Sequence, residues 1–191
     1  QKSKTKILSE NNITKIDWES YNLDFLIEAT GVSKNVEDSK VLLEEKKIKK
    51  IFFTFSPDIE DFTMVLGCNE SNFKSKNHNL ISTSICDATA LAPVIKLLNN
   101  EYEINNGYIT TLHPWLSYQN IMDGPSSSWS SPGEIYHHYA LGRSVIGNLI
   151  PKPTTAIDVT LKSIPEIEKN KLGVFSYRTP TAIVCSADVS L

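Results

Sequence analysis

The chain has 191 residues, of which 40% are hydrophobic, and its formal net charge of −3 comes from acidic and basic residues mixed along its length. That length suits one large domain or parts of two, and the mixed charge excludes the clustered basic face that nucleic-acid binding requires. No apolar run is long enough to span a membrane, and three widely spaced cysteines fit a reducing cytoplasm better than a disulfide framework.

The first part of the chain alternates short apolar runs with one amphipathic segment. Residues 23–28 are predicted to form a buried strand, and residues 36–47 a helix with Ser33 or Asn35 as its N-cap. Further strands are predicted at 51–54 and 64–66. The order strand, helix, strand is half of a nucleotide-binding α/β unit, in which the ligand lies at the carboxyl ends of the strands.

The second part begins with an amphipathic helix over residues 88–100, directly after Cys86. Strands are predicted at 108–112, 174–178 and 183–189, because β-branched and aromatic residues dominate there. The segment 126–153 is rich in serine, glycine and proline, and is predicted to be a long irregular loop of the kind that often carries function.

Cys86 and His113 are the candidate nucleophile and base. Cys86 stands where a strand ends and a helix begins, and unpaired N–H groups and the helix dipole favour a thiolate there. His113 ends the predicted strand 108–112, in a position to meet Cys86. Two other interpretations stay open, since buried cysteines are usually inert and a lone histidine is often only a satisfied polar residue.

A metal site is not predicted. His137 and His138 are adjacent, but no carboxylate or cysteine stands at ligand spacing from them.

Residues 26–189 resemble the middle of a glyceraldehyde-3-phosphate dehydrogenase. Short segments typical of that family occur in the family's order with near-family spacing. They are Ile27-Glu28-Ala29-Thr30-Gly31-Val32, Phe55-Ser56-Pro57, Leu66-Gly67-Cys68-Asn69, Ser84-Ile85-Cys86 with Leu91-Ala92-Pro93, Thr110-Thr111-Leu112-His113, Met122-Asp123-Gly124-Pro125, Leu149-Ile150-Pro151, Leu172-Gly173 and Arg178-Thr179-Pro180-Thr181.

The resemblance implies an α/β and α+β architecture. Residues 1–85 would be the second half of a Rossmann-like NAD-binding domain, and residues 86–191 a catalytic domain with a mixed or antiparallel sheet. The family's glycine-rich turn, which grips the cofactor's pyrophosphate, has no G-x-G-x-x-G counterpart here and is expected upstream of Gln1. The family's last helix and strand are expected downstream of Leu191, so the chain is interpreted as about the middle three-fifths of a subunit.

The resemblance also implies the chemistry and its residues. Cys86 would form a thiohemiacetal and then a thioester with an aldehyde, His113 would move the proton, and NAD or NADP would take the hydride. Arg178 would hold the substrate's own phosphate, with Thr154 and Arg143 as further phosphate-binding residues. Thr30, Gly31 and Phe55 would line the cofactor. A small-molecule aldehyde and a homotetramer are the expected partners, without nucleic acid or membrane.

The chain departs from the family where the attacking phosphate would bind. Ile85 and Asp87 flank the cysteine in place of a serine and a threonine, and Thr155 replaces a glycine. Leu116 and Tyr118 stand where the family has threonines. Asp87 suits a helix N-terminus but opposes both a thiolate and a phosphate dianion, each by about 1 kcal/mol. These losses favour release of the thioester without inorganic phosphate.

Two alternatives to the dehydrogenase remain. The first is a cofactor-independent acyl-transfer enzyme or hydrolase that uses Cys86 and His113 without hydride transfer. The second is a non-catalytic relative that acts as a binding or assembly module, which is consistent with Asp87 and the lost donors.

Overall fold

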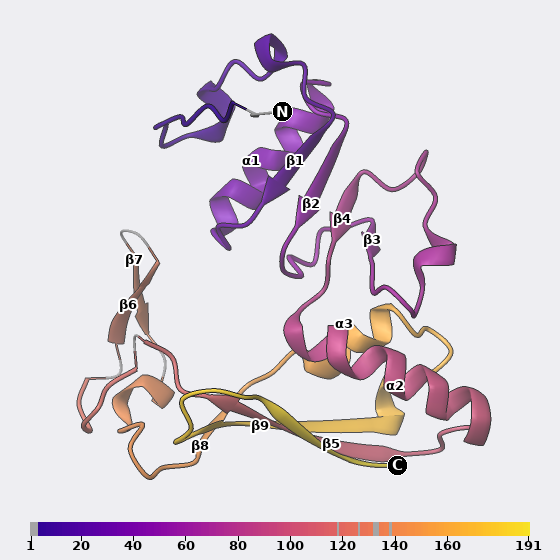
Figure 1. Ribbon diagram of the computed structural model, residues 1–191, viewed down its shortest axis with the longest axis vertical. Helices are drawn as coiled ribbons and strands as arrows, with labels where there is room; N and C mark the ends of the chain where they lie inside the picture. The colour runs from indigo at the N-terminus through magenta and orange to yellow at the C-terminus, as the bar shows by residue number, and fades with distance from the viewer. Residues whose placement is uncertain (1–3, 118, 126, 132–133, 138) are drawn as a thin grey trace. The chain divides into compact units, whose positions relative to one another are not determined.

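The computed structural model describes residues 4–117, 119–125, 127–131, 134–137 and 139–191 (Figure 1). The chain forms two compact units, one composed of Gln1–Met64 and Glu70–Ser84 and the other of Val65–Asn69 and Ile85–Leu191. Among the helices of the described residues, none combines the length and apolar character needed to cross a lipid bilayer.

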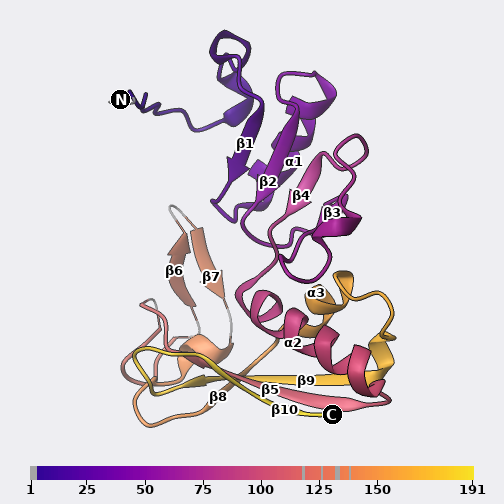
Figure 2. The same cartoon turned by 45° about the vertical axis from the view of Figure 1, so that its right-hand side comes forward.

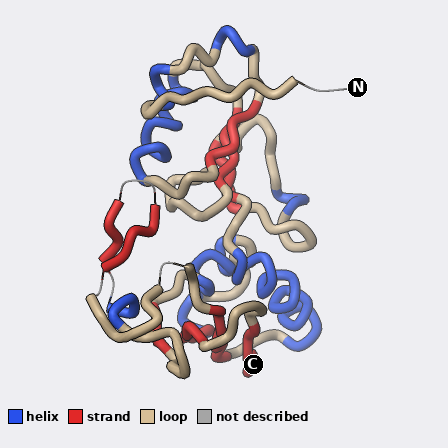
Figure 3. Tube along the Cα trace, turned by 60° about the vertical axis from the view of Figure 1, so that its left-hand side comes forward, coloured by secondary structure: helices blue, strands red, loops and turns tan. Residues whose placement is uncertain are grey.

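The first unit is a parallel α/β layer. Its sheet has the order β1-β2-β4-β3, formed by Phe25–Glu28, Lys50–Phe53, Leu80–Ser82 and Phe62–Thr63, with every neighbouring pair parallel. Helix α1 (Ser33–Glu44) lies along this sheet, and its buried Val36 and Leu42 share a core with Ile51 and Phe53. The segment before β1 is largely loop with two short 3-10 turns, η1 (Ile13–Lys15) and η2 (Glu19–Tyr21), and a third, η3 (Glu70–Asn72), precedes β4 (Figure 3).

The second unit is a mixed layer of strands covered by helices. Its four-stranded sheet has the order β10-β5-β9-β8, formed by Ser186–Ser190, Gly107–Pro114, Leu172–Thr179 and Ile150–Lys152. The central pair β5 and β9 is parallel and both outer pairs are antiparallel. Helices α2 (Cys86–Tyr102) and α3 (Ala156–Lys162) lie on one face of the sheet, as Figure 2 shows. The parallel and mixed sheets confirm the predicted α/β and α+β class.

The core of the second unit joins α2 to the sheet. Leu91, Ala92 and Ile95 of α2 pack in one cluster with Ile109 of β5 and Leu172 of β9. The spacing of the three helical residues places them on one face. The apolar stripe predicted from the sequence is confirmed in part: Leu91 and Ile95 are buried, whereas Val94 and Leu97 are 50% and 61% exposed. This packing fixes where the first turn of α2 meets the end of β5.

The remaining elements belong to the connections of the second unit. They are β6 (Ser127–Ser131), β7 (Glu134–His137), η4 (Tyr139–Gly142) and η5 (Lys169–Lys171). Strands β6 and β7 form an antiparallel hairpin. The prediction of an irregular loop over residues 126–153 is therefore wrong in part, because that segment holds this hairpin and also strand β8.

Three other local predictions are also wrong. Neither Ser33 nor Asn35 caps α1: the N-cap is Val32, without a side-chain bond, because the Thr30 hydroxyl already accepts the Val32 N–H at 3.2 Å. The strand predicted at 64–66 ends at Thr63 instead, since the Asn69 side chain accepts the Val65 N–H at 2.9 Å and turns the chain. The strand predicted at 183–189 begins only at Ser186.

Replacing Ile95 with alanine tests the core. Ile95 is fully buried in the cluster between α2 and the sheet, whereas its neighbour Val94 is 50% exposed. We expect Ile95→Ala to lower the free energy of unfolding by about 2–5 kcal/mol, because it removes buried methyl groups and leaves a cavity. Val94→Ala, the matched control, should change it by less than about 0.5 kcal/mol. Urea denaturation followed by circular dichroism measures both, and equal effects would contradict this placement of the helix.

Candidate active site

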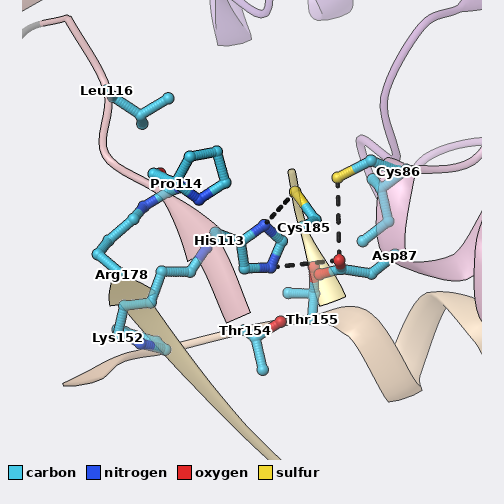
Figure 4. Close-up of a pocket in the computed structure, with 12 residues that line it drawn as sticks. Cys86, Asp87, His113, Pro114, Leu116, Lys152, Thr154, Thr155, Arg178 and Cys185 are labelled. Atoms are coloured by element: carbon cyan, nitrogen blue, oxygen red, sulfur yellow. Dashed lines mark hydrogen bonds and ion pairs between the residues drawn. The ribbon is translucent and has the colours of Figure 1, made fainter. Parts of the chain in front are cut away.

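A cavity of about 520 Å³ opens at the first turn of α2, entirely within the second unit. It brings together a thiol, a carboxylate, an imidazole and two cationic side chains, as Figure 4 shows. The residues that line it are Ile85, Cys86, Asp87, His113, Pro114, Leu116, Lys152, Pro153, Thr154, Thr155, Arg178 and Cys185.

Local structure explains how these side chains meet. Cys86 is the first residue of α2, after the extended N-cap Ile85. His113 is the penultimate residue of β5 and pairs in register with Arg178 of the parallel strand β9. Neighbours in register project to the same face of a sheet, so the histidine and the arginine both face the cavity. Sequence analysis predicted that Cys86 and His113 would meet, and the structure brings them together.

Asp87 stands between the thiol and the imidazole. Its Oδ1 lies 3.2 Å from Nε2 of His113 and 4.0 Å from Sγ of Cys86 (Figure 4). The imidazole and the carboxylate are both nearly buried, with 6% of the His113 side chain and 12% of the Asp87 side chain exposed. Cys86, in contrast, is exposed. If His113 is protonated, the Asp87 carboxylate lies next to its positive charge. Asp87 then competes with a Cys86 thiolate for the interaction with the imidazolium.

The environment raises the pKa of the Cys86 thiol above its ordinary value. Although the residue as a whole is exposed, desolvation of the thiol is the largest cause and the Asp87 carboxylate is the next, while the backbone N–H of Asp87 acts in the opposite direction. The helix N-terminus was predicted to favour the thiolate. The backbone N–H of Asp87 does act in that direction, but burial and the Asp87 carboxylate outweigh it, so the net shift is toward the protonated thiol.

Cys185 contacts the other side of the imidazole. Its Sγ lies 3.6 Å from Nδ1 of His113, and the Thr179 hydroxyl donates to the His113 carbonyl oxygen at 3.0 Å. Sequence analysis did not identify Cys185. It follows β9 in a connecting loop, and only the return of the chain into β10 brings it to His113.

Two cations line the part of the cavity away from Cys86. Arg178 donates from Nη1 to the Pro114 carbonyl oxygen at 3.1 Å, which fixes the guanidinium at the cavity wall. Lys152, at the end of β8, lines the same cavity, and burial followed by the nearby Arg178 charge lowers the pKa of its amine. Sequence analysis missed Lys152. Lys152 is two residues after the buried Ile150, so in a strand both side chains lie on the same face. The spacing predicts this only if β8 is already known to be a strand.

The other predicted phosphate-binding residues divide between the cavity and the surface. Thr154 lines the cavity, and its Oγ1 accepts the N–H of Ala156 at 3.1 Å. Arg143 does not line it: its Nη1 lies 3.5 Å from Oδ2 of Asp123, with both side chains largely exposed. Leu116 adds an apolar wall, whereas Tyr118 and His138 lie outside the described residues.

Thr30, Gly31 and Phe55 belong to the first unit. They follow the carboxyl ends of β1 and β2, the edge at which parallel α/β sheets bind ligands. Gly31 has a φ of +70°, and among the described residues, its two chain neighbours apart, no heavy atom lies within 4 Å of the point that a Cβ would occupy. The backbone at this turn is therefore open to close approach by a ligand.

Comparison with known proteins identifies relatives. Residues 85–191 match the family model described as the glyceraldehyde 3-phosphate dehydrogenase C-terminal domain. The chain is 29% identical over 184 residues to glyceraldehyde-3-phosphate dehydrogenase 1 of Bacillus cereus, covering 96% of this chain and 52% of that protein. It is 31% identical over 189 residues to glyceraldehyde-3-phosphate dehydrogenase of Wickerhamomyces ciferrii, covering 98% and 52%. The chain spans about half the length of the curated relatives it matches.

Replacing Asp87 with asparagine tests the electrostatic role of its carboxylate. Asp87→Asn removes the negative charge next to Cys86, so the pKa of the thiol should fall and more thiolate should exist at neutral pH. We expect the rate of alkylation by iodoacetamide at pH 7 to rise by about fivefold, which corresponds to about 1 kcal/mol. Peptide mapping of rates between pH 6 and pH 10 measures the shift.

Asp123→Asn is the matched control, since it removes an exposed carboxylate outside the cavity and should leave the rate unchanged. A slower rate in Asp87→Asn would mean that the carboxylate assists the thiolate instead, by holding His113 in its charged form.

Proposed function

This chain belongs to the glyceraldehyde 3-phosphate dehydrogenase family, and we propose that it is the catalytic part of an NAD- or NADP-dependent aldehyde dehydrogenase that works through a thioester on Cys86. The observation that carries this proposal is the joining of Cys86 and His113 in one cavity with two cations, Lys152 and Arg178. A thiol supplies the covalent adduct, an imidazole moves the proton, and the cations suit an anionic substrate.

The first step is addition of Cys86 to the aldehyde. The sulfur forms a bond to the carbonyl carbon, and the carbonyl oxygen takes a proton to give a thiohemiacetal. Because the thiol pKa is raised, the proton on sulfur must leave before attack, and His113 is the base in the cavity that can receive it. The imidazolium then gives this proton to the carbonyl oxygen, which leaves His113 neutral for the next step.

The second step needs a base for the hydroxyl proton of the thiohemiacetal. His113 is buried, and the contacts with Cys185 and Asp87 hold its ring in place, so it can take that proton as the carbon is oxidised to a thioester. The positive charge that forms on the ring lies 3.2 Å from the Asp87 oxygen. Asp87 thus opposes the thiolate in the first step and stabilises the imidazolium in the second.

The nicotinamide cofactor supplies the acceptor for the hydride. Thr30, Gly31 and Phe55 fit a nucleotide: the open turn at Gly31 admits close approach, and the half-buried Phe55 offers an apolar surface. A ring contact between Phe55 and the buried Phe53, with centroids 5.9 Å apart, fixes that surface. The choice between NAD and NADP rests on no residue described in this unit.

Arg178 and Lys152 support an aldehyde that carries a phosphate, such as glyceraldehyde 3-phosphate. The guanidinium offers a planar pair of donors for phosphate oxygens, and Lys152 adds a second positive charge in the same cavity. Thr154 contributes a hydroxyl to the wall between Lys152 and Thr155. Arg143 is left out of this assignment because it lies with Asp123 at the surface.

Water is proposed to release the acyl group in place of inorganic phosphate. Ile85 and Asp87 flank the sulfur, and neither side chain offers a donor to an attacking dianion. The Asp87 carboxylate repels phosphate but accepts a hydrogen bond from water. The product is then an acid.

The wider expectations from the family belong to the same proposal. Residues 1–85 would be part of the nucleotide-binding domain and residues 86–191 part of the catalytic domain, in a cytoplasmic homotetramer. The division of the chain next to Ser84 and Ile85 supports that boundary, while Val65–Asn69 pack with the second unit.

One observation favours a second function. The raised pKa of Cys86 and the Asp87 carboxylate beside it also suit a non-catalytic relative, in which the cysteine no longer needs to be a thiolate. A cofactor-independent Cys–His acyl-transfer enzyme would need the same thiolate as the dehydrogenase, so Asp87 does not favour it.

Substitution of the cysteine and the histidine tests the dehydrogenase. Cys86→Ser should abolish formation of NADH or NADPH from glyceraldehyde 3-phosphate, because a hydroxyl does not form the thioester. His113→Asn should lower kcat by about 10²- to 10⁴-fold, since proton transfer is lost. Cys68→Ser is the control, because Cys68 is buried in the core and does not line the cavity. Absence of nucleotide reduction in the unaltered protein, with either nucleotide, would favour the non-catalytic relative.

The phosphate dependence of turnover tests the release step. With water as the acceptor, the rate should not saturate with millimolar inorganic phosphate, and the product should be the carboxylic acid. Asp87→Thr, which replaces the carboxylate with a hydroxyl donor, should make the rate phosphate-dependent. A hydroxylamine assay for acyl phosphate measures the product. Acyl phosphate from the unaltered protein would contradict hydrolytic release.

A further inference from the structure

We propose that Cys86, Asp87 and His113 form a binding site for one zinc-like divalent cation, which blocks the cysteine reversibly. The three side chains offer a sulfur, a carboxylate oxygen and an imidazole nitrogen, and these donor atoms all lie within 4.8 Å of one another. Sequence spacing did not predict this site because its ligands come from the start of α2 and the end of β5, and they meet only in the folded chain.

The distances are close to those of a tetrahedral zinc site. Zinc binds sulfur at about 2.3 Å and nitrogen or oxygen at about 2.0–2.2 Å, so two ligands of one ion lie about 3.3–3.6 Å apart. Asp87 Oδ1 is already 3.2 Å from His113 Nε2, and it is 4.0 Å from Cys86 Sγ. The Cys86 sulfur would have to move toward the other two ligands to bind the same ion, and its exposure leaves room for that movement.

His113 gives independent support for a ligand at this place. The side chain is buried, and Nε2 has no hydrogen-bond partner among the described residues. The contact with Asp87 has the separation of an ion pair but not the direction of a hydrogen bond. Cys185 contacts Nδ1, the opposite ring nitrogen, and so orients the ring with Nε2 toward Cys86 and Asp87. A buried imidazole nitrogen directed at a carboxylate and a thiol is what a cation would satisfy.

The donor set selects the kind of ion. Thiolate and imidazole are the ligands of zinc and similar transition metals, whereas calcium and magnesium require mostly oxygen. Three protein ligands leave a fourth position for water. Lys152 and Arg178 in the same cavity oppose a cation, so the site is suited to reversible occupancy rather than to a permanent structural ion.

A bound cation would occupy the Cys86 sulfur that the proposed dehydrogenase reaction needs. A zinc-bound thiolate does not add to an aldehyde, and His113 bound through Nε2 does not accept a proton there. This consequence for turnover rests on the proposed function, whereas the binding itself does not.

Zinc titration against a chromophoric chelator tests the site, using the reduced protein without aldehyde or nucleotide. We expect one Zn²⁺ per chain, and at least tenfold weaker binding in both Cys86→Ser and Asp87→Asn. His78→Gln and Asp123→Asn are matched controls, a half-buried histidine of the first unit and an exposed carboxylate, both outside the cavity, and should bind as tightly as the unaltered protein. Co²⁺ should produce a thiolate-to-metal absorption band that Cys86→Ser removes.

Protection of Cys86 gives a second readout. Zn²⁺ should slow alkylation of Cys86 by iodoacetamide at least tenfold, and a chelator should restore the original rate. The proposal is overturned if Zn²⁺ affinity is unchanged in Cys86→Ser and Asp87→Asn, or if Co²⁺ gives no thiolate band. Zinc binding without nucleotide reduction would refute the dehydrogenase alone, and nucleotide reduction without zinc binding would refute this site alone.

Discussion

The packing of α2 onto the mixed sheet is the constraint on which the candidate site depends. Ile95 of the helix and Ile109 of β5 share one buried cluster, and this contact sets the position of both elements along their length. The first turn of α2 then carries Cys86 and Asp87 to the end of β5, where His113 stands. No bond between the functional residues creates this arrangement. Apolar burial fixes the backbone, and the polar side chains converge as a result.

A single carboxylate changes the character of this site. Asp87 suits the positive end of the helix dipole, yet it raises the pKa of the adjacent thiol and offers His113 a partner other than the thiolate. The same charge would stabilise an imidazolium, repel a phosphate dianion and supply a ligand for a metal ion. The proposed hydrolytic release and the proposed cation site thus rest on the same carboxylate.

Elements with a local residue pattern can be predicted from the sequence. Residues whose position depends on which strands pair in the sheet cannot. The apolar spacing of α2 and the β-branched run of β5 are local, so the meeting of Cys86 with His113 could be predicted. Lys152 could not be, because its direction follows from the pairing of β8 with β9. Cys185 reaches His113 only through the return of the chain after β9. The missed N-cap of α1 has a similar reason: the Thr30 hydroxyl, outside the helix, already organises that turn.

Charge divides the cavity into two ends. Lys152 and Arg178 lie on one side of His113, and Cys86 and Asp87 lie on the other (Figure 4). Under the proposed function, an anionic aldehyde would bind with its phosphate toward the cations and its carbonyl toward the sulfur, since the reverse orientation would bring the phosphate against Asp87. In the proposed mechanism, a second anion that released the thioester would have to approach the acidic end, because the acyl group's own phosphate would occupy the basic end. A neutral water molecule would meet no such repulsion, so the charges proposed to orient the substrate would also favour water as the acceptor.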